Sequence, residues 1–152
     1  MKKIFEGLYS LAVALWVGGL VAIAAAATVL FTGLLDHAVA GTLANKMFAI
    51  IAYAGMAFGA YLLLYLLLRR GGRAPGSGVF WIVLAMLALT LAIHFGIQPI
   101  LDQLRADALP QKVMESALRA SFVKWHSVSS ALYVLQSLLG LWLVVWQNHG
   151  KH

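Results

Sequence analysis

The chain has 152 residues, of which 62% are hydrophobic and only 11% are charged. Soluble domains carry about 25% charged residues. The charges here are too few to cover a water-exposed surface, which excludes a soluble protein. Because the chain contains no cysteine, disulfides, iron–sulfur clusters and covalently attached haem are excluded as well.

Long stretches of the sequence contain no Asp, Glu, Lys or Arg, at residues 7–35, 47–68, 74–101 and 125–150. Each exceeds the roughly 18–20 apolar residues that cross about 30 Å of hydrocarbon. Lipid offers no hydrogen-bond partners and the stretches lack the alternation of barrel strands, so each should form a helix. We predict one integral membrane domain over residues 1–152, an all-α four-helix transmembrane bundle, with spans at about 6–35, 46–69, 78–101 and 122–147.

The connections between the predicted spans differ in character. Residues 36–45 are expected to form a short link, and residues 69–78 a basic turn rich in glycine without a helical pattern. Residues 102–124 place apolar side chains on one helical face and charged side chains on the other. We predict an interfacial amphipathic helix over about 110–121, which either lies on the lipid surface or binds a partner.

The net charge of +6 comes from lysines and arginines that flank the spans. In that position they are topology signals and headgroup contacts, so we expect the lipid bilayer as a partner and no nucleic acid. Because the chain crosses the membrane twice before it, the basic turn after the second span lies on the same side of the membrane as Lys2 and Lys3. The positive-inside rule therefore favours cytoplasmic N- and C-termini.

Polar residues inside the spans are the candidates for function, because hydrophobic residues only permit insertion. They recur at steps of three and four in the fourth span and at steps of four in the third. We expect both stripes to face the bundle interior, in the same outer half of the bilayer as two threonines of the first span. The predicted ligand-binding residues are Thr28, Thr32, His94, Gln98, His126, Ser129, Ser130 and Tyr133.

Histidines are the most specific members of this set. An imidazole in the membrane needs hydrogen-bond partners for both nitrogens, and His94 and His126 lie inside predicted spans, with His37 just outside. Imidazole suits Zn, Cu or Ni, so His94, His126 and His37 are candidate ligands of a loose, weakly selective metal site. The alternative is that each histidine is simply hydrogen-bonded within the bundle.

Small residues at helical spacing predict close approach of the helices. Gly55 and Gly59 form a Gly-x-x-x-Gly motif, and two adjacent glycines follow Trp16 in the first span. The predicted helix-packing residues are Gly18, Gly19, Gly55, Gly59 and Gly140.

Several motifs resemble the eukaryotic transmembrane-protein-205 family and its small bacterial relatives. They are Ala14-Leu15-Trp16-Val17-Gly18-Gly19, Val29-Leu30-Phe31, His37, Gln98-Pro99 and Phe122-Val123-Lys124-Trp125-His126-Ser127-Val128-Ser129-Ser130. Ser127 departs from the usual glycine, and Gln98 stands where relatives often have an acid. The resemblance covers nearly the whole chain. It implies four membrane helices, here in a bacterial inner membrane, and brings no settled activity.

Three classes of function fit these observations. The first is a non-enzymatic protein that binds or passes a small ligand or metal cation. The second is a redox protein that holds haem b between His94 and His126, or a quinone. The third is an accessory subunit of a larger complex or a homo-oligomer. We expect no catalysis, because the spans contain no acidic residue to orient a histidine.

Overall fold

The computed structural model describes residues 2–33 and 36–149, which form helices joined by short connections. In chain order the elements are α1 (Lys2–Gly33), α2 (His37–Arg70), the 3₁₀ helix η1 (Gly71–Gly76), α3 (Gly78–Leu91), the π-helix η2 (Ala92–Ile97), α4 (Gln98–Asp107), the 3₁₀ helix η3 (Val113–Glu115) and α5 (Arg119–His149). No β strand occurs within these two described ranges. The prediction of an all-α protein is confirmed.

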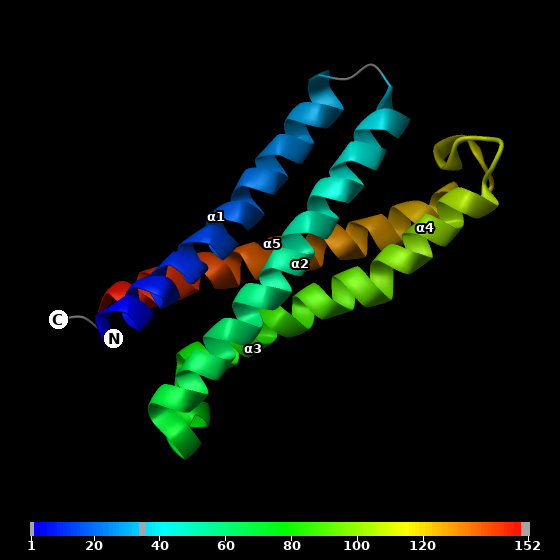
Figure 1. The fold of residues 1–152 in the computed structure, drawn as a ribbon. Coiled ribbons are helices and arrows are strands. Elements are labelled where there is room, and N and C mark those ends of the chain that lie inside the picture. The colour runs from blue at the N-terminus through cyan, green and yellow to red at the C-terminus, as the bar shows by residue number, and fades with distance from the viewer. Residues whose placement is uncertain (1, 34–35, 150–152) are drawn as a thin grey trace.

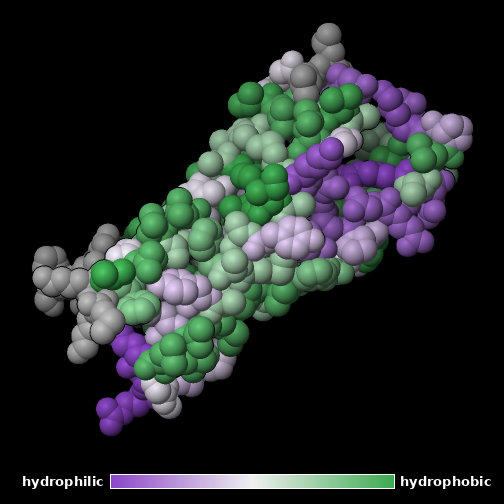
Figure 2. Space-filling model, viewed as in Figure 1, coloured by the Kyte–Doolittle hydropathy of each residue, from purple (hydrophilic) through white to green (hydrophobic). Residues whose placement is uncertain are grey.

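Four helical segments are long and apolar enough to cross a membrane: Ile4–Gly33, His37–Gly76, Gly78–Asp107 and Arg119–Trp146. Their outer surfaces carry large apolar side chains, such as Ile50, which is 68% exposed, and Leu68, which is 78% exposed. Figure 2 shows hydrophobic residues over much of this face. Such a surface is stable against acyl chains rather than water. The four-helix membrane bundle is therefore confirmed.

The helices form two antiparallel pairs. α1 and α2 lie side by side, while α3, η2 and α4 follow one another as one long helical segment that runs beside α5 (Figure 1). We call the end that contains η1 and the start of α1 the arginine end. The opposite end, with the end of α1, the start of α2 and residues 108–118, is the loop end. Toward the loop end α1 and α2 lean away from α4 and α5 (Figure 1).

The arginine half of the bundle is packed around Trp16, whose side chain is fully buried with Leu62, Val83, Met86 and Leu143. The glycines of α2 make room for the indole. A Cβ added to Gly55 would lie 2.6 Å from Trp16 Nε1, and one added to Gly59 would lie 3.0 Å from Trp16 Cη2. Such close approach of two helices requires residues without side chains.

The other predicted packing glycines behave differently from one another. An added Cβ on Gly140 would lie 2.9 Å from Val17 Cγ2, and one on Gly19 would lie 2.5 Å from Ile51 Cδ1. The packing prediction for Gly18 is wrong, because Gly18 is exposed and an added Cβ would meet nothing within 4 Å. It neighbours Gly19 in sequence but points about 100° away around the helix.

The helix that contains the second predicted span begins nine residues earlier than predicted, at His37 rather than at residue 46. Residues 36–45 are not a link, because α2 begins at His37. The Asp36 side chain accepts a hydrogen bond from the Ala38 N–H at 2.8 Å and caps the helix there. The third segment also continues past residue 101, through α4. The predicted end of the first span at residues 34–35 lies outside the described residues.

The amphipathic helix predicted over 110–121 is not formed. Only the three residues of η3 are helical before α5 begins at Arg119. Ser116 Oγ accepts a hydrogen bond from the Leu118 N–H at 3.2 Å. This local bond competes with helical hydrogen bonds, so the chain is not helical here and α5 begins only after it. Within the basic turn, by contrast, Gly71–Gly76 forms the 3₁₀ helix η1.

Candidate functional site

A cavity of about 350 Å³ opens in the loop half of the bundle, where the two helix pairs lean apart. Its apolar wall includes Leu20, Phe48 and Ile51. Seven of the eight residues predicted to bind a ligand line it: Thr28, His94, Gln98, His126, Ser129, Ser130 and Tyr133. Thr32 does not line it, and its hydroxyl donates to the Thr28 carbonyl oxygen, 3.1 Å away.

Two hydrogen bonds between helices, one half-buried and one buried, close the cavity on the side of the packed core. Tyr133 of α5 donates from its hydroxyl to the Leu20 carbonyl oxygen at 2.7 Å, which ties α5 to α1. Gln136 donates from Nε2 to Thr90 Oγ1 at 2.8 Å, and both side chains are buried. Hydrogen bonds of this kind between helices stabilise a membrane bundle. These two bonds form the floor of the cavity.

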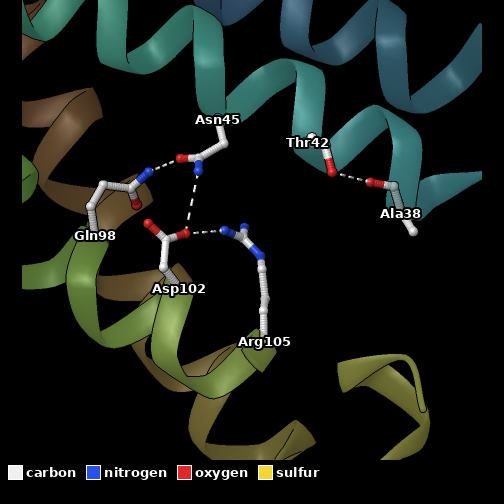
Figure 3. Close-up of polar contacts among 6 residues, drawn as sticks. All are labelled: Ala38, Thr42, Asn45, Gln98, Asp102 and Arg105. Atoms are coloured by element: carbon white, nitrogen blue, oxygen red, sulfur yellow. Dashed lines mark hydrogen bonds and ion pairs between the residues drawn. The ribbon is translucent and has the colours of Figure 1, made fainter. Parts of the chain in front are cut away.

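A polar network stands at the loop end of the cavity (Figure 3). Gln98 of α4 donates from Nε2 to Asn45 Oδ1 of α2. Asn45 donates from Nδ2 to Asp102 Oδ1 at 3.3 Å, and Arg105 binds the same oxygen at 2.8 Å. The network joins the two helix pairs where they diverge. Figure 2 shows hydrophilic residues gathered toward the loop end.

Sequence reasoning missed Asn45, Asp102 and Arg105 as members of this site. Asn45 fell in the expected link, and the other two fell beyond the expected third span. A usable signal was present, because Gln98, Asp102 and Arg105 follow one another at steps of four and three. Such spacing places them on one face of any helix that continues past residue 101.

A local change in helical geometry places His94. It lies in the π-helix η2, where the Gln98 N–H bonds to the Ile93 carbonyl, five residues back. Pro99 has no N–H, so the regular bonding pattern is broken at this point. π-turns are frequent at functional sites, because the extra residue in the turn changes the direction of a side chain. The His94 ring meets Tyr53 edge-on, with ring centroids 4.7 Å apart.

His126 lies in a column of stacked groups at the side of the cavity. Its ring is stacked on Phe122, with centroids 5.9 Å apart and planes 5° apart. The guanidinium of Arg105 lies over the Phe122 ring, 5.2 Å from its centroid. The column holds the His126 ring by packing rather than by a hydrogen bond.

The polar groups that line the cavity fall into two kinds. Ser130 and Thr28 donate their hydroxyls to backbone carbonyls of their own helices, His126 O and Ala24 O. His94, His126 and Ser129 differ, because their side chains make no hydrogen bond to any residue that the structure describes. Imidazole and hydroxyl groups each offer a donor and an acceptor. These three side chains are therefore available to a bound molecule.

The predicted three-histidine metal site is not formed in this structure. Residues 2–33 and 36–149 contain no group of three or more His, Cys, Asp or Glu that could hold a metal ion. His37 does not line the cavity, and its ring instead is stacked on Phe31 at 6.4 Å. Only His94 and His126 of the predicted set line the cavity.

Helices of membrane-spanning length that enclose a partly polar cavity define a small integral membrane protein. The sequence profile described as "Domain of unknown function (DUF4149)" matches residues 11–110. The chain therefore belongs to the DUF4149 family. The matched region runs from α1 through α4 and supplies every wall of the cavity except that of α5. Comparisons with curated proteins and with solved structures gave no match.

Proposed function

We propose that this protein binds a small, uncharged, amphipathic molecule in the cavity of its loop half. The observation that carries the proposal is the set of three unpaired polar side chains, His94, His126 and Ser129, on the wall of one cavity inside a membrane bundle. A polar group in a membrane is costly unless it has a partner. A ligand or water must supply the partners that the protein does not.

The charge of the lining favours an uncharged ligand. Of the residue types Asp, Glu, Lys and Arg, the described lining contains Arg105 alone. Its guanidinium is paired with Asp102 at 2.8 Å. Isolated charges are expensive in low-dielectric surroundings. Because the cavity offers no uncompensated charge, a charged ligand would gain little there.

The size and chemistry of the lining favour a molecule with a flat polar head. The cavity of about 350 Å³ falls within the 300–1,000 Å³ range of typical small-molecule sites. Aromatic rings of Phe48 and Tyr133, whose centroids are 5.0 Å apart, form part of its wall. Rings pack well against a planar group, while the imidazoles can hydrogen-bond its edge.

The experiment compares the small molecules that co-purify with the protein and with matched variants. His94→Phe and His126→Phe keep a ring for the contacts with Tyr53 and Phe122 but remove the hydrogen-bonding nitrogens. His37→Phe is the control, since His37 lies outside the cavity. Mass spectrometry of solvent extracts should find a molecule near one per protein in the wild type and in His37→Phe, and a several-fold loss in the two cavity variants. An unchanged extract in both cavity variants would contradict the proposal.

A quinone is the specific candidate that the lining favours, because imidazole N–H groups can donate to the two carbonyl oxygens of a ring that lies against Phe48 and Tyr133. Titration with ubiquinone-1 tests it. Loss of one hydrogen bond costs about 1 kcal/mol, so each His→Phe variant should bind about fivefold more weakly. If the wild type shows no saturable binding, quinone is excluded as the ligand. The broader proposal that the cavity binds a small molecule is then tested by the extract experiment alone. The haem b alternative requires a Soret band in protein made with added haem.

A further inference from the structure

A second cavity lies at the arginine end, on the opposite side of the packed core from the first. It has a volume of about 820 Å³ and is formed by α1, α2, the start of α3 and the end of α5. Polar residues contribute much of its lining, including Glu6, Ser10, Arg69, Arg70 and Ser77. None of these residues belongs to the site described above.

The two arginines of this cavity are held differently. Arg69 is fixed by two neighbours, because its guanidinium donates to Glu6 Oε1 and to the Tyr65 hydroxyl, each at 2.8 Å. Arg70 makes no side-chain hydrogen bond or ion pair within the described residues. Glu6 compensates one of the two positive charges. The lining therefore keeps one positive charge, on a side chain that is free to bind an anion.

Aromatic residues place this cavity at the depth of lipid headgroups. Tyr9, Tyr65 and Trp146 line it, and Trp81 and Trp142 are exposed at the same end of the bundle. Tyr and Trp are enriched at the boundary between hydrocarbon and water. Lipid phosphates occur at this level of a membrane, and their negative charge complements the lining.

Apolar side chains continue from the cavity toward the bundle centre. Trp142 of α5, which is 59% exposed, lies one turn nearer the centre than the lining residue Trp146, and the centroids of the two rings are 6.0 Å apart. An occupant with an anionic head and apolar chains could use both surfaces at once. A soluble anion would use only the arginines.

We propose that the cavity at the arginine end is a binding site for the headgroup of an anionic glycerophospholipid. Arg70 binds the phosphate directly. Arg69, held in place by Glu6 and Tyr65, supplies a second donor group at the wall of the cavity. The acyl chains lie along the exposed apolar surface of α5.

The test is native mass spectrometry of the full-length protein in detergent with equal amounts of phosphatidylglycerol and phosphatidylcholine. Arg70→Gln removes the free cation, and Arg73→Gln is the matched control, since Arg73 lies in the adjacent η1 outside the cavity. A basic group near the membrane surface contributes about 1 kcal/mol to binding an anionic lipid, or about a fivefold change in affinity. Bound phosphatidylglycerol should fall by about that factor in Arg70→Gln and stay within twofold of wild type in Arg73→Gln.

Equal losses of bound phosphatidylglycerol in both variants would overturn the site, because they would mean that any basic residue at this end attracts the lipid. No loss in Arg70→Gln would overturn it as well. Excess inorganic phosphate should leave the bound phosphatidylglycerol in place, and its displacement would show a site for free phosphate rather than lipid. Arg70 is exposed, so Arg70→Gln should leave the thermal midpoint unchanged, and a lipid loss then reports binding rather than misfolding.

Discussion

The fully buried indole of Trp16 depends on two glycines of α2 for its place in the core. Gly55→Ala puts a methyl group 2.6 Å from Trp16 Nε1, so the indole or the helix must move. Overpacking of this kind costs about 1–3 kcal/mol. We expect a lower thermal midpoint for Gly55→Ala in detergent, measured by differential scanning fluorimetry.

Gly18→Ala is the matched control for that substitution. The added methyl group meets nothing within 4 Å, and alanine is favoured over glycine in a helix by up to about 1 kcal/mol. The variant should be as stable as the wild type or more stable. A Gly18→Ala variant that loses as much stability as Gly55→Ala would contradict the assigned packing.

The buried pair Thr90 and Gln136 at the cavity floor should show measurable coupling. Thr90 Oγ1 accepts from Gln136 and donates to the Met86 carbonyl at 2.9 Å, so the pair links α3 with α5. Interhelical hydrogen bonds in membranes average about 0.6 kcal/mol, with a maximum near 1.7. A double-mutant cycle of Thr90→Val and Gln136→Leu should give a coupling energy in that range. The control is a second cycle of Thr90→Val and Ser137→Ala. Its coupling energy should be about zero, because the Ser137 hydroxyl donates to the Tyr133 carbonyl oxygen of its own helix.

At the scale of elements, Asp36 decides where α2 begins. The Ala38 N–H, and secondarily the charge of Lys112, hold the pKa of the Asp36 carboxyl below its ordinary value of 3.8. A carboxyl whose pKa is lower in the folded state stabilises the fold above its unfolded pKa, and this stabilisation is lost as the pH falls through the folded value. Asp36→Ala should therefore lower the thermal midpoint at neutral pH. The difference from wild type should shrink below about pH 4, and a difference that is independent of pH would contradict the carboxylate role.

The number and type of elements were predictable because lipid imposes a strong, simple constraint on length and polarity. The start of α2 was not, because residues 36–45 are mixed in composition and only the Asp36 cap distinguishes a helix from a link. The helix expected over 110–121 failed for the opposite reason. Its periodicity was clear, but the local hydrogen bonds of Ser116 outweigh it.

At the scale of the molecule, the polar stripes of the third and fourth spans were predicted to face one interior space, and their residues line one cavity. The cavity itself could not be predicted, because it depends on how far the two helix pairs lean apart (Figure 1). The role of Asn45 depends on the same arrangement, since it meets Gln98 and Asp102 only across the gap between pairs.

The predicted topology can be tested because the chain has no cysteine of its own. Arg73→Cys and Gln111→Cys introduce single thiols at the arginine end and at the loop end. A membrane-impermeant maleimide applied to intact cells should label Gln111→Cys only, if both termini are cytoplasmic. Labelling of Arg73→Cys instead would reverse the orientation, and labelling of both from outside would mean that the segment Gly78–Asp107 between them does not cross the membrane.

A membrane bundle with this cavity requires that the polar side chains of α5 face the cavity while the side chains next to them face lipid. The most direct measurement compares Ser129→Cys, in the cavity lining, with Val128→Cys, which is exposed on the adjacent face. A thiol reacts as its thiolate, which forms where water reaches and is suppressed in hydrocarbon. A small water-soluble methanethiosulfonate reagent should modify Ser129→Cys at least tenfold faster than Val128→Cys in native membranes. Equal, slow modification of both cysteines would mean that position 129 also faces acyl chains, and would contradict the placement of Ser129 in the cavity wall.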